Sequence, residues 1–197
     1  MRFILYFSGE HHKLPRAEFE AVAAGEGITW NVVSESARTL IFDTPCKDSS
    51  LLKRLALTKT AGYYVGSADD LHASAEEVHK LLKTSDSFRV KCNSENLERK
   101  LGAAIHALGH EVKLKDADCE IFKAENHIGV KIPLNRDFNK RKPQHRPFFK
   151  PTSMHPKIAR LLVNLAHVKA GNTVLDPFCG TGGILIEAAL MKMKVSG

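Results

Sequence analysis

The stretch of this sequence best suited to chemistry is LDPFCGTGG, residues 175–183. It places one carboxylate, Asp176, directly before a turn that contains Gly180, Gly182 and Gly183. Glycines let a ligand approach the backbone closely, and the first N–H groups of a following helix attract negative charge. The carboxylate can accept hydrogen bonds from a cationic or hydroxylated ligand. These residue types in this order are typical of a nucleotide-cofactor site.

The elements on either side of the turn predict how it is held. TVLD (173–176) is a short apolar strand that ends in the acid, and ILIEAALMKM (184–193) has the composition of a helix. Apolar residues almost surround this helix, so we expect it to be buried. The strand would end at the carboxyl edge of a parallel sheet, with the helix N-terminus facing that edge. Open α/β sheets bind ligands there.

Two common phosphate-binding motifs fit this turn poorly. A Walker loop needs a lysine after its glycines, and none follows here. A dinucleotide fingerprint needs a third glycine at the position that Leu185 occupies. A glycine-rich turn without any ligand is the remaining alternative. The clustering of an acid, a proline and three glycines favours a ligand site instead.

Composition narrows the class of protein. With 197 residues, 43% of them hydrophobic, the chain can fold as one large or two small domains. No run of 18 apolar residues occurs, so no transmembrane helix is predicted. The four cysteines are far apart and form no CxxC pair, which argues against a structural zinc site. We expect reduced thiols, no metal and a cytoplasmic location.

Positive charge gathers in the second half of the chain. The net charge is +7, and residues 101–150 carry ten basic and six acidic side chains. Residues 151–197 carry five basic and two acidic side chains. A basic surface there predicts a polyanionic partner, with nucleic acid the first candidate. A general solubility charge is the alternative.

The order of predicted elements divides the chain into segments. Residues 1–68 read as strand-helix-strand-strand-helix-strand, the order of a small ferredoxin-like domain. Residues 69–134 read as a second α/β unit, in which SFRVKCN alternates apolar side chains with Arg89 and Lys91. Its second helix carries Arg99 and Lys100. The fold class is therefore α/β with an α+β N-terminal part.

Residues 135–152 are interpreted as a basic, proline-containing linker that leads into the last segment, 153–197. Its prolines argue against a long helix or a central strand. The linker is either a solvated spacer or a phosphate contact. Phe148 and Phe149 are expected to pack on a domain rather than stack on a base. The basic cluster consists of Arg136, Lys140, Arg141, Lys142, Arg146 and Lys150.

LDPFCGTGG closely resembles the first motif of class I S-adenosylmethionine-dependent methyltransferases, and more narrowly the subgroup that modifies RNA bases. RPFFKPTSMHPKIARLLVNLA resembles the segment before that motif in archaeal tRNA guanosine-N2 methyltransferases of the G10 type, relatives of the eukaryotic Trm eleven family. SFRVKCN, the following helix and CEIFKAENHIGVKIPL resemble a THUMP domain, an RNA-binding module. The resemblance spans the whole chain.

The resemblance implies tRNA modification, with tRNA as partner, S-adenosylmethionine as cofactor and a monomer at full length. It implies a ferredoxin-like domain at 1–68, THUMP at 69–134 and the start of a Rossmann-like methyltransferase domain at 153–197. The residues expected at the methionine end of the cofactor are Asp176, Phe178, Cys179, Gly180, Thr181, Gly182 and Gly183, covered by Phe149, Thr152 and Met154. The residues expected to bind RNA are Arg89, Lys91, Arg99, Lys100 and the six basic residues of the linker.

Two elements of that family are missing from the sequence. The family's next strand ends in an acid that binds the cofactor ribose, and a later [DN]PP[YF] motif holds the target amine; neither occurs here. The resemblance therefore implies a C-terminally truncated enzyme that does not catalyse alone. One alternative is a non-catalytic tRNA-binding module. The other is a fragment of a DNA amino-methyltransferase, which shares the glycine motif.

Overall fold

The computed structural model describes residues 1–83, 86–134, 136–148 and 150–197 of a mixed α/β chain. The chain splits into two compact units, each assembled from separate segments. The first unit contains residues 1–6, 31–43 and 60–132. The second unit contains residues 7–30, 44–59 and 133–197.

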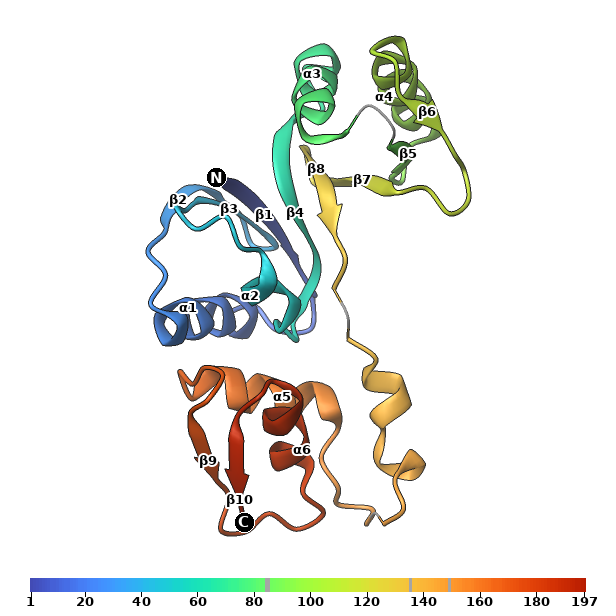
Figure 1. The fold of residues 1–197 in the computed structure, drawn as a ribbon. Helices are drawn as coiled ribbons and strands as arrows, with labels where there is room; N and C mark the ends of the chain where they lie inside the picture. The colour runs from blue at the N-terminus through green and yellow to red at the C-terminus, as the bar shows by residue number, and fades with distance from the viewer. Residues whose placement is uncertain (84–85, 135, 149) are drawn as a thin grey trace. The chain divides into compact units, whose positions relative to one another are not determined.

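One sheet of eight strands forms the first unit, in the order β2-β3-β1-β4-β8-β7-β5-β6 (Figure 1). The strands are β1 (Arg2–Phe7), β2 (Asn31–Glu35), β3 (Thr39–Asp43), β4 (Thr58–Ser67), β5 (Ser87–Lys91), β6 (Glu111–Val112), β7 (Cys119–Ala124) and β8 (His127–Ile132). The long strand β4 pairs antiparallel with β8 and so continues the sheet past residue 68. The division at that residue stays a prediction.

Two helices of the first unit begin where the sequence places a capping side chain. The Asp70 carboxylate accepts from the Ala73 N–H at 3.0 Å at the start of α3 (Leu71–Leu81). Ser94 accepts from the Leu97 N–H at 3.4 Å at the start of α4 (Glu95–Ala107). Such caps satisfy N–H groups that the helix itself leaves open. The apolar faces of both helices join one core with strands β5, β7 and β8.

The second unit holds the glycine turn within a short parallel pair of strands (Figure 1). Its elements are α1 (Leu14–Glu26), α2 (Ser50–Lys53), the 3-10 turns η1 (Phe138–Arg141) and η2 (Pro143–His145), α5 (Pro156–Leu165), β9 (Thr173–Leu175), α6 (Gly183–Leu190) and β10 (Lys194–Ser196). Parallel strands need a crossover, and α6 provides it between β9 and β10. Helix α5 packs on both α1 and α6.

The predicted β-α-β-β-α-β order over residues 1–68 is confirmed, but its second helix is shorter than the sequence indicates. The pattern SSLLKRLALTKTA predicts a helix from Ser49 onward, whereas α2 ends at Lys53. The N–H groups of Ala56 and Leu57 donate to the buried carboxylate of Glu18, at 2.6 and 2.9 Å. A side chain distant in sequence thus takes the donors that a longer helix would use.

The expectation that α6 is buried on almost all sides is wrong for this chain. Ile186 and Leu190 are 36% and 54% exposed, whereas the charged Glu187 is 0% exposed. Helix α6 buries the Glu187 carboxylate because Arg141 and Arg160, from two other elements, pair with it. The strands β6 and β10 were not predicted, and each has at most three residues.

Candidate cofactor site

The glycine turn has the backbone geometry that its glycines permit. Strand β9 ends at Leu175, and Gly180 and Gly182 adopt φ values of +54° and +71°, which side chains other than glycine rarely tolerate. The Phe178 N–H donates to Asp176 Oδ1 at 3.2 Å. The Gly182 N–H donates to the Cys179 carbonyl at 2.7 Å. These two bonds hold the turn directly before helix α6.

A cavity of about 240 Å³ opens at this turn. Two segments line it, the residues before α5 and the turn itself. Phe178, at 93% exposed, is the most exposed large apolar side chain on it. The lining residues are Lys150, Thr152, Ser153, Met154, Asp176, Phe178, Cys179, Gly180, Thr181, Gly183 and Ile184.

Most residues predicted for the cofactor come together at this cavity. Thr152 and Met154 lie opposite the turn although more than twenty residues separate them from Asp176 in the sequence. Gly182 belongs to the turn but not to the lining. Phe149, also predicted, lies outside the described residues. That these residues bind a cofactor stays a prediction.

Ser153 is a residue of the cavity that the sequence did not single out. Its Oγ accepts from the Lys150 N–H at 2.9 Å and from Thr181 Oγ1 at 3.0 Å. The second bond joins the segment before α5 to the glycine turn. The sequence could have pointed to Ser153 only through its neighbours Thr152 and Met154, which were predicted to cover the cofactor. The hydrogen bond with Thr181 depends on the fold.

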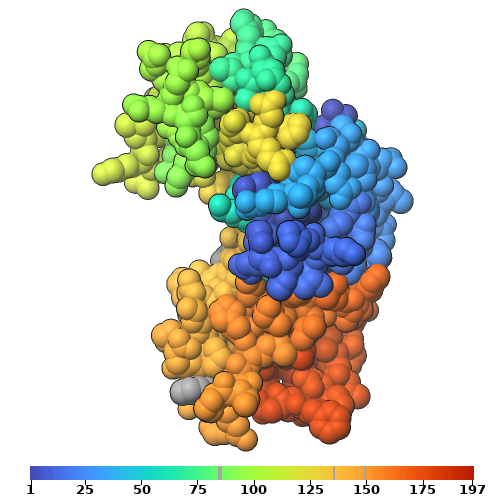
Figure 2. Space-filling view, turned by 180° about the vertical axis from the view of Figure 1, so that it is seen from behind, coloured from blue at the N-terminus to red at the C-terminus, as the bar shows by residue number. Residues whose placement is uncertain are grey.

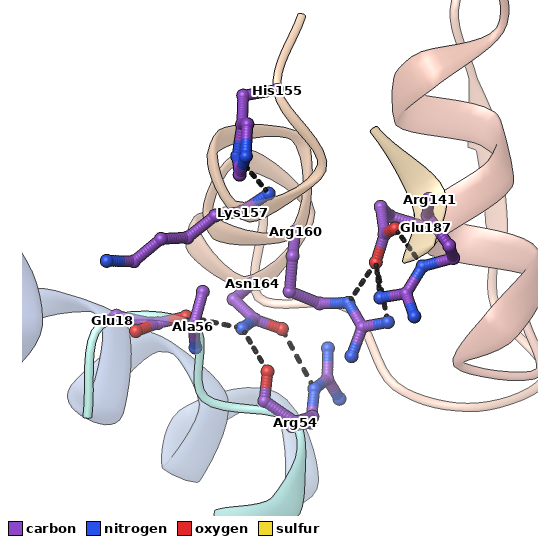
Figure 3. Close-up of polar contacts among 9 residues, drawn as sticks. All are labelled: Glu18, Arg54, Ala56, Arg141, His155, Lys157, Arg160, Asn164 and Glu187. Carbon is purple, nitrogen blue, oxygen red and sulfur yellow. Dashed lines mark hydrogen bonds and ion pairs between the residues drawn. The ribbon is translucent and has the colours of Figure 1, made fainter. Parts of the chain in front are cut away.

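A buried ionic cluster lies at α6, the helix that follows the turn (Figure 3). Glu187 accepts from Arg141 Nε at 2.8 Å and from Arg160 Nε at 2.9 Å. Arg141 comes from η1 and Arg160 from α5, so one carboxylate ties three elements together. Burial lowers the pKa of Arg160, while the charge of Glu187 opposes that shift. Removing one member of such a group leaves an unpaired buried charge.

A second polar network joins α5 to α1 and to the segment after α2 (Figure 3). Asn164 donates from Nδ2 to Glu18 Oε1 at 2.6 Å and to the Arg54 carbonyl at 3.0 Å. Its Oδ1 accepts from Arg54 Nε at 2.9 Å. Burial raises the pKa of Glu18, and the N–H groups of Ala56 and Leu57 act against that shift. The network fixes the helix that leads into the site.

The basic residues predicted to bind RNA fall into two groups. In the first unit, Arg89 and Lys131 both pair with Glu120, which leaves Lys91, Arg99 and Lys100 as the exposed cations of the predicted set. Their role toward RNA stays a prediction.

In the second unit, several basic side chains of the linker are held by contacts within the unit, and the space-filling view shows the linker alongside the α5 segment (Figure 2). The expectation that Phe148 packs on a domain is wrong, because this side chain is 65% exposed. Arg136 donates to the carbonyls of Ala56 and Lys59 at 3.4 and 3.2 Å, and burial lowers its pKa to about 10. Arg141 pairs with Glu187, and Arg146 Nε donates to the Arg141 carbonyl at 3.1 Å. Lys140 pairs with Asp137, and Lys150 lies exposed at the cavity.

Within residues 1–83, 86–134, 136–148 and 150–197, no cluster of three or more His, Cys, Asp or Glu side chains could hold a metal ion. None of the helices in those ranges is long and apolar enough to cross a membrane.

Comparison with family models gives a match to the C-terminal part of the chain. Residues 143–197 match a family described as the RMKL-like methyltransferase domain. This range contains the segment before α5, the glycine turn and α6. The crystal structure of TrmN from Thermus thermophilus shares the fold over 99% of this chain and 64% of that chain, at 24% identity and a TM-score of 0.56.

Curated relatives match a larger part of the chain. It is 38% identical to the tRNA (guanine(10)-N2)-dimethyltransferase of Methanothermobacter thermautotrophicus, over 100% of this chain and 64% of the relative. It is 37% identical to the protein of the same description from Pyrococcus abyssi, over 75% of this chain and 49% of the relative. The chain is thus a homologue of the tRNA (guanine(10)-N2)-dimethyltransferases, as the sequence resemblance predicted. It spans less than two thirds of the length of these relatives.

Proposed function

We propose that this chain serves a tRNA (guanine-N2) methyltransferase, which transfers the methyl group of S-adenosylmethionine to the exocyclic amine of guanosine 10. The observation that carries the proposal is the cavity at the glycine turn, in a chain homologous along its length to enzymes described by that reaction. The chain would contribute the first part of the cofactor site and the RNA-binding surface.

The residues present fit the amino-acid end of the cofactor. The N–H groups of the first turn of α6 have no partner within the helix, and Gly182 supplies no capping side chain. Such donors suit a carboxylate. Asp176, at the end of β9, suits an ammonium group. When bound, S-adenosylmethionine supplies an electrophilic methyl group, while Thr152, Met154 and Phe178 line the cavity that would hold it.

The finer domain assignment belongs to the same proposal. The strand order β2-β3-β1-β4 with two intervening helices supports a ferredoxin-like arrangement for residues 1–68. Residues 69–134 would form the THUMP module, with Lys91, Arg99 and Lys100 toward RNA phosphates. Residues 153–197 would begin a Rossmann-like domain, which the parallel pair β9–β10 supports.

We expect the 197 residues to bind tRNA without methylating it. An exocyclic amine is a poor nucleophile, so it needs a hydrogen-bond acceptor and accurate placement against the methyl group. The family motif that supplies these, [DN]PP[YF], does not occur in the sequence. An assay of the chain should therefore detect tRNA binding but no methyl transfer.

The test measures binding of the chain to a tRNA transcript and to duplex DNA of equal length at several salt concentrations. We expect tRNA to bind more tightly at matched salt, with affinity falling as salt rises because phosphate contacts release counterions. Tighter binding to duplex DNA would favour the alternative that the chain is a fragment of a DNA amino-methyltransferase. Methyl transfer to tRNA by this chain would contradict the proposed division of binding and catalysis.

A further inference from the structure

The guanidinium of Arg146 is incompletely satisfied by the described residues. Its Nε donates to the Arg141 carbonyl at 3.1 Å. Its Nη1 and Nη2 are both buried and have no hydrogen-bond partner among residues 1–83, 86–134, 136–148 and 150–197. A buried polar group without a partner destabilises the fold, and a charged one does so more strongly. A bound anion would give these two nitrogens the hydrogen-bond partners that the described residues do not provide.

The position of this guanidinium indicates which anion. Gly183 begins α6, and a Cβ built on it would lie 3.6 Å from Arg146 Nη1 and 3.9 Å from Met154 Cβ. Gly183 and Met154 both line the cavity at the glycine turn. The N-terminus of a helix carries partial positive charge, so it repels the guanidinium beside it. An anion in the cavity would relieve that repulsion and pair with both groups.

The carboxylates nearby are already engaged. Glu187, the buried acid of α6, is paired with Arg141 and Arg160. Asp176 accepts from the Phe178 N–H within the turn. The Glu187–Arg141 pair also fixes η1, whose last residue supplies the carbonyl that orients Arg146. Arg141 and Glu187 thus act as positioning residues for the guanidinium.

We propose that Arg146 is the counter-ion for the carboxylate at the amino-acid end of the cofactor, rather than an RNA contact as the sequence suggested. The inference rests on the proposed function. A guanidinium and a carboxylate match as a two-donor, two-acceptor pair. Arg146 Nη1 and the cavity residue Met154 both lie beside the Cβ position of Gly183, so a carboxylate held at the start of α6 would lie near Nη1 and Nη2. An RNA phosphate, held on a bulky backbone, reaches buried nitrogens poorly.

The experiment compares two ligands on the 197-residue chain by calorimetry. One is S-adenosylhomocysteine, and the other is its decarboxylated form, which lacks only the carboxylate. We expect Arg146→Met to weaken S-adenosylhomocysteine about tenfold to a hundredfold, the value of one charge-assisted pair, and to leave the decarboxylated ligand nearly unchanged. Arg146→Lys keeps the charge and should lie between. Lys169→Met, a loss of charge at an exposed position that does not line the cavity, should affect neither ligand.

Three outcomes would overturn the inference. Equal weakening of both ligands by Arg146→Met would give Arg146 a structural role only. Unchanged ligand affinity with weaker tRNA binding would return Arg146 to the RNA surface. Failure of the unmodified chain to bind either nucleoside would contradict the proposed cofactor site itself, and the inference with it. If Arg146→Met does not fold by circular dichroism, Arg146→Lys carries the comparison alone.

Discussion

At the scale of single residues, Asn164 shows how one buried amide can connect distant parts of the chain. It is 0% exposed, and its side-chain amide bonds to the Glu18 carboxylate, the Arg54 carbonyl and the Arg54 guanidinium. Both partners are ionisable side chains shielded from solvent, and the Asn164 amide gives each of them a hydrogen-bond partner. Such networks are strong when complete and costly when one member is removed.

Asn164→Leu should therefore lower the free energy of unfolding by about 2–4 kcal/mol, because it leaves donors and acceptors on Glu18 and Arg54 unpaired. Urea denaturation followed by circular dichroism measures the change. Asn139→Leu, at an exposed position of η1, is the control and should change stability by less than about 0.5 kcal/mol. Equal effects of the two substitutions would show that the network contributes little.

His155 makes the start of α5 sensitive to pH. Its Nδ1 accepts from the Lys157 N–H at 3.2 Å, which requires a neutral ring. Burial, then the charges of Lys142 and Lys157, lower the pKa of His155 below its ordinary value of 6.5. The unfolded chain thus binds the proton more readily, so this contribution to stability is present above pH 6.5 and is lost as pH falls through the lowered pKa.

The replacement His155→Asn tests this dependence, since asparagine can cap the helix without titrating. We expect the wild-type chain to lose more stability than the variant between pH 7 and pH 5, measured as urea unfolding free energies. Parallel pH profiles for the two proteins would mean that the cap does not titrate in this range.

At the scale of elements, sequence patterns predicted local structure better than the contacts between segments. The glycine turn was predictable because its φ values depend on residues 180 and 182 alone. The pairing of Ser153 with Thr181 and of Asn164 with Glu18 was not, because each joins residues 28 and 146 positions apart. The short α2 has the same cause, since Glu18 competes for its backbone donors. Local preference gave way to tertiary contacts at these places.

Close packing of α1 gives a prediction at this scale. A Cβ on Gly25 would lie 2.7 Å from the His167 carbonyl oxygen, so Gly25→Ala should destabilise the chain by about 1–3 kcal/mol through overpacking. Gly102, in α4, has nothing within 4 Å of such a Cβ. Gly102→Ala should therefore stabilise by about 0.5–1 kcal/mol, from helix propensity alone. Thermal denaturation of both variants would contradict this account if they shift in the same direction.

At the scale of the whole molecule, the charge of +7 supports the proposed RNA partner only through the cations that remain exposed. Several basic residues of the linker are held inside the protein, with Arg136 and Arg141 the clearest cases. Charge counted along the sequence therefore overstates the surface available to phosphates. The exposed cations of the first unit are the better candidates.

Lys91→Ala and Lys100→Ala should each weaken tRNA binding similarly for all tRNA sequences, and each should reduce the slope of log affinity against log salt by about one. Lys80→Ala is a suitable control, because Lys80 already pairs with Glu77. Filter binding at four salt concentrations gives the slopes. An unchanged slope in both test variants would place the RNA surface elsewhere on the chain.

The most direct test of the central claim is equilibrium binding of labelled S-adenosylmethionine to the chain, with S-adenosylhomocysteine, ATP and NAD as competitors. We predict that only S-adenosylhomocysteine competes, and that Asp176→Ala weakens binding about tenfold by removing the acceptor that follows β9. Competition by ATP or NAD at similar concentrations, or full affinity in Asp176→Ala, would show that the glycine turn is not a methyl-donor site.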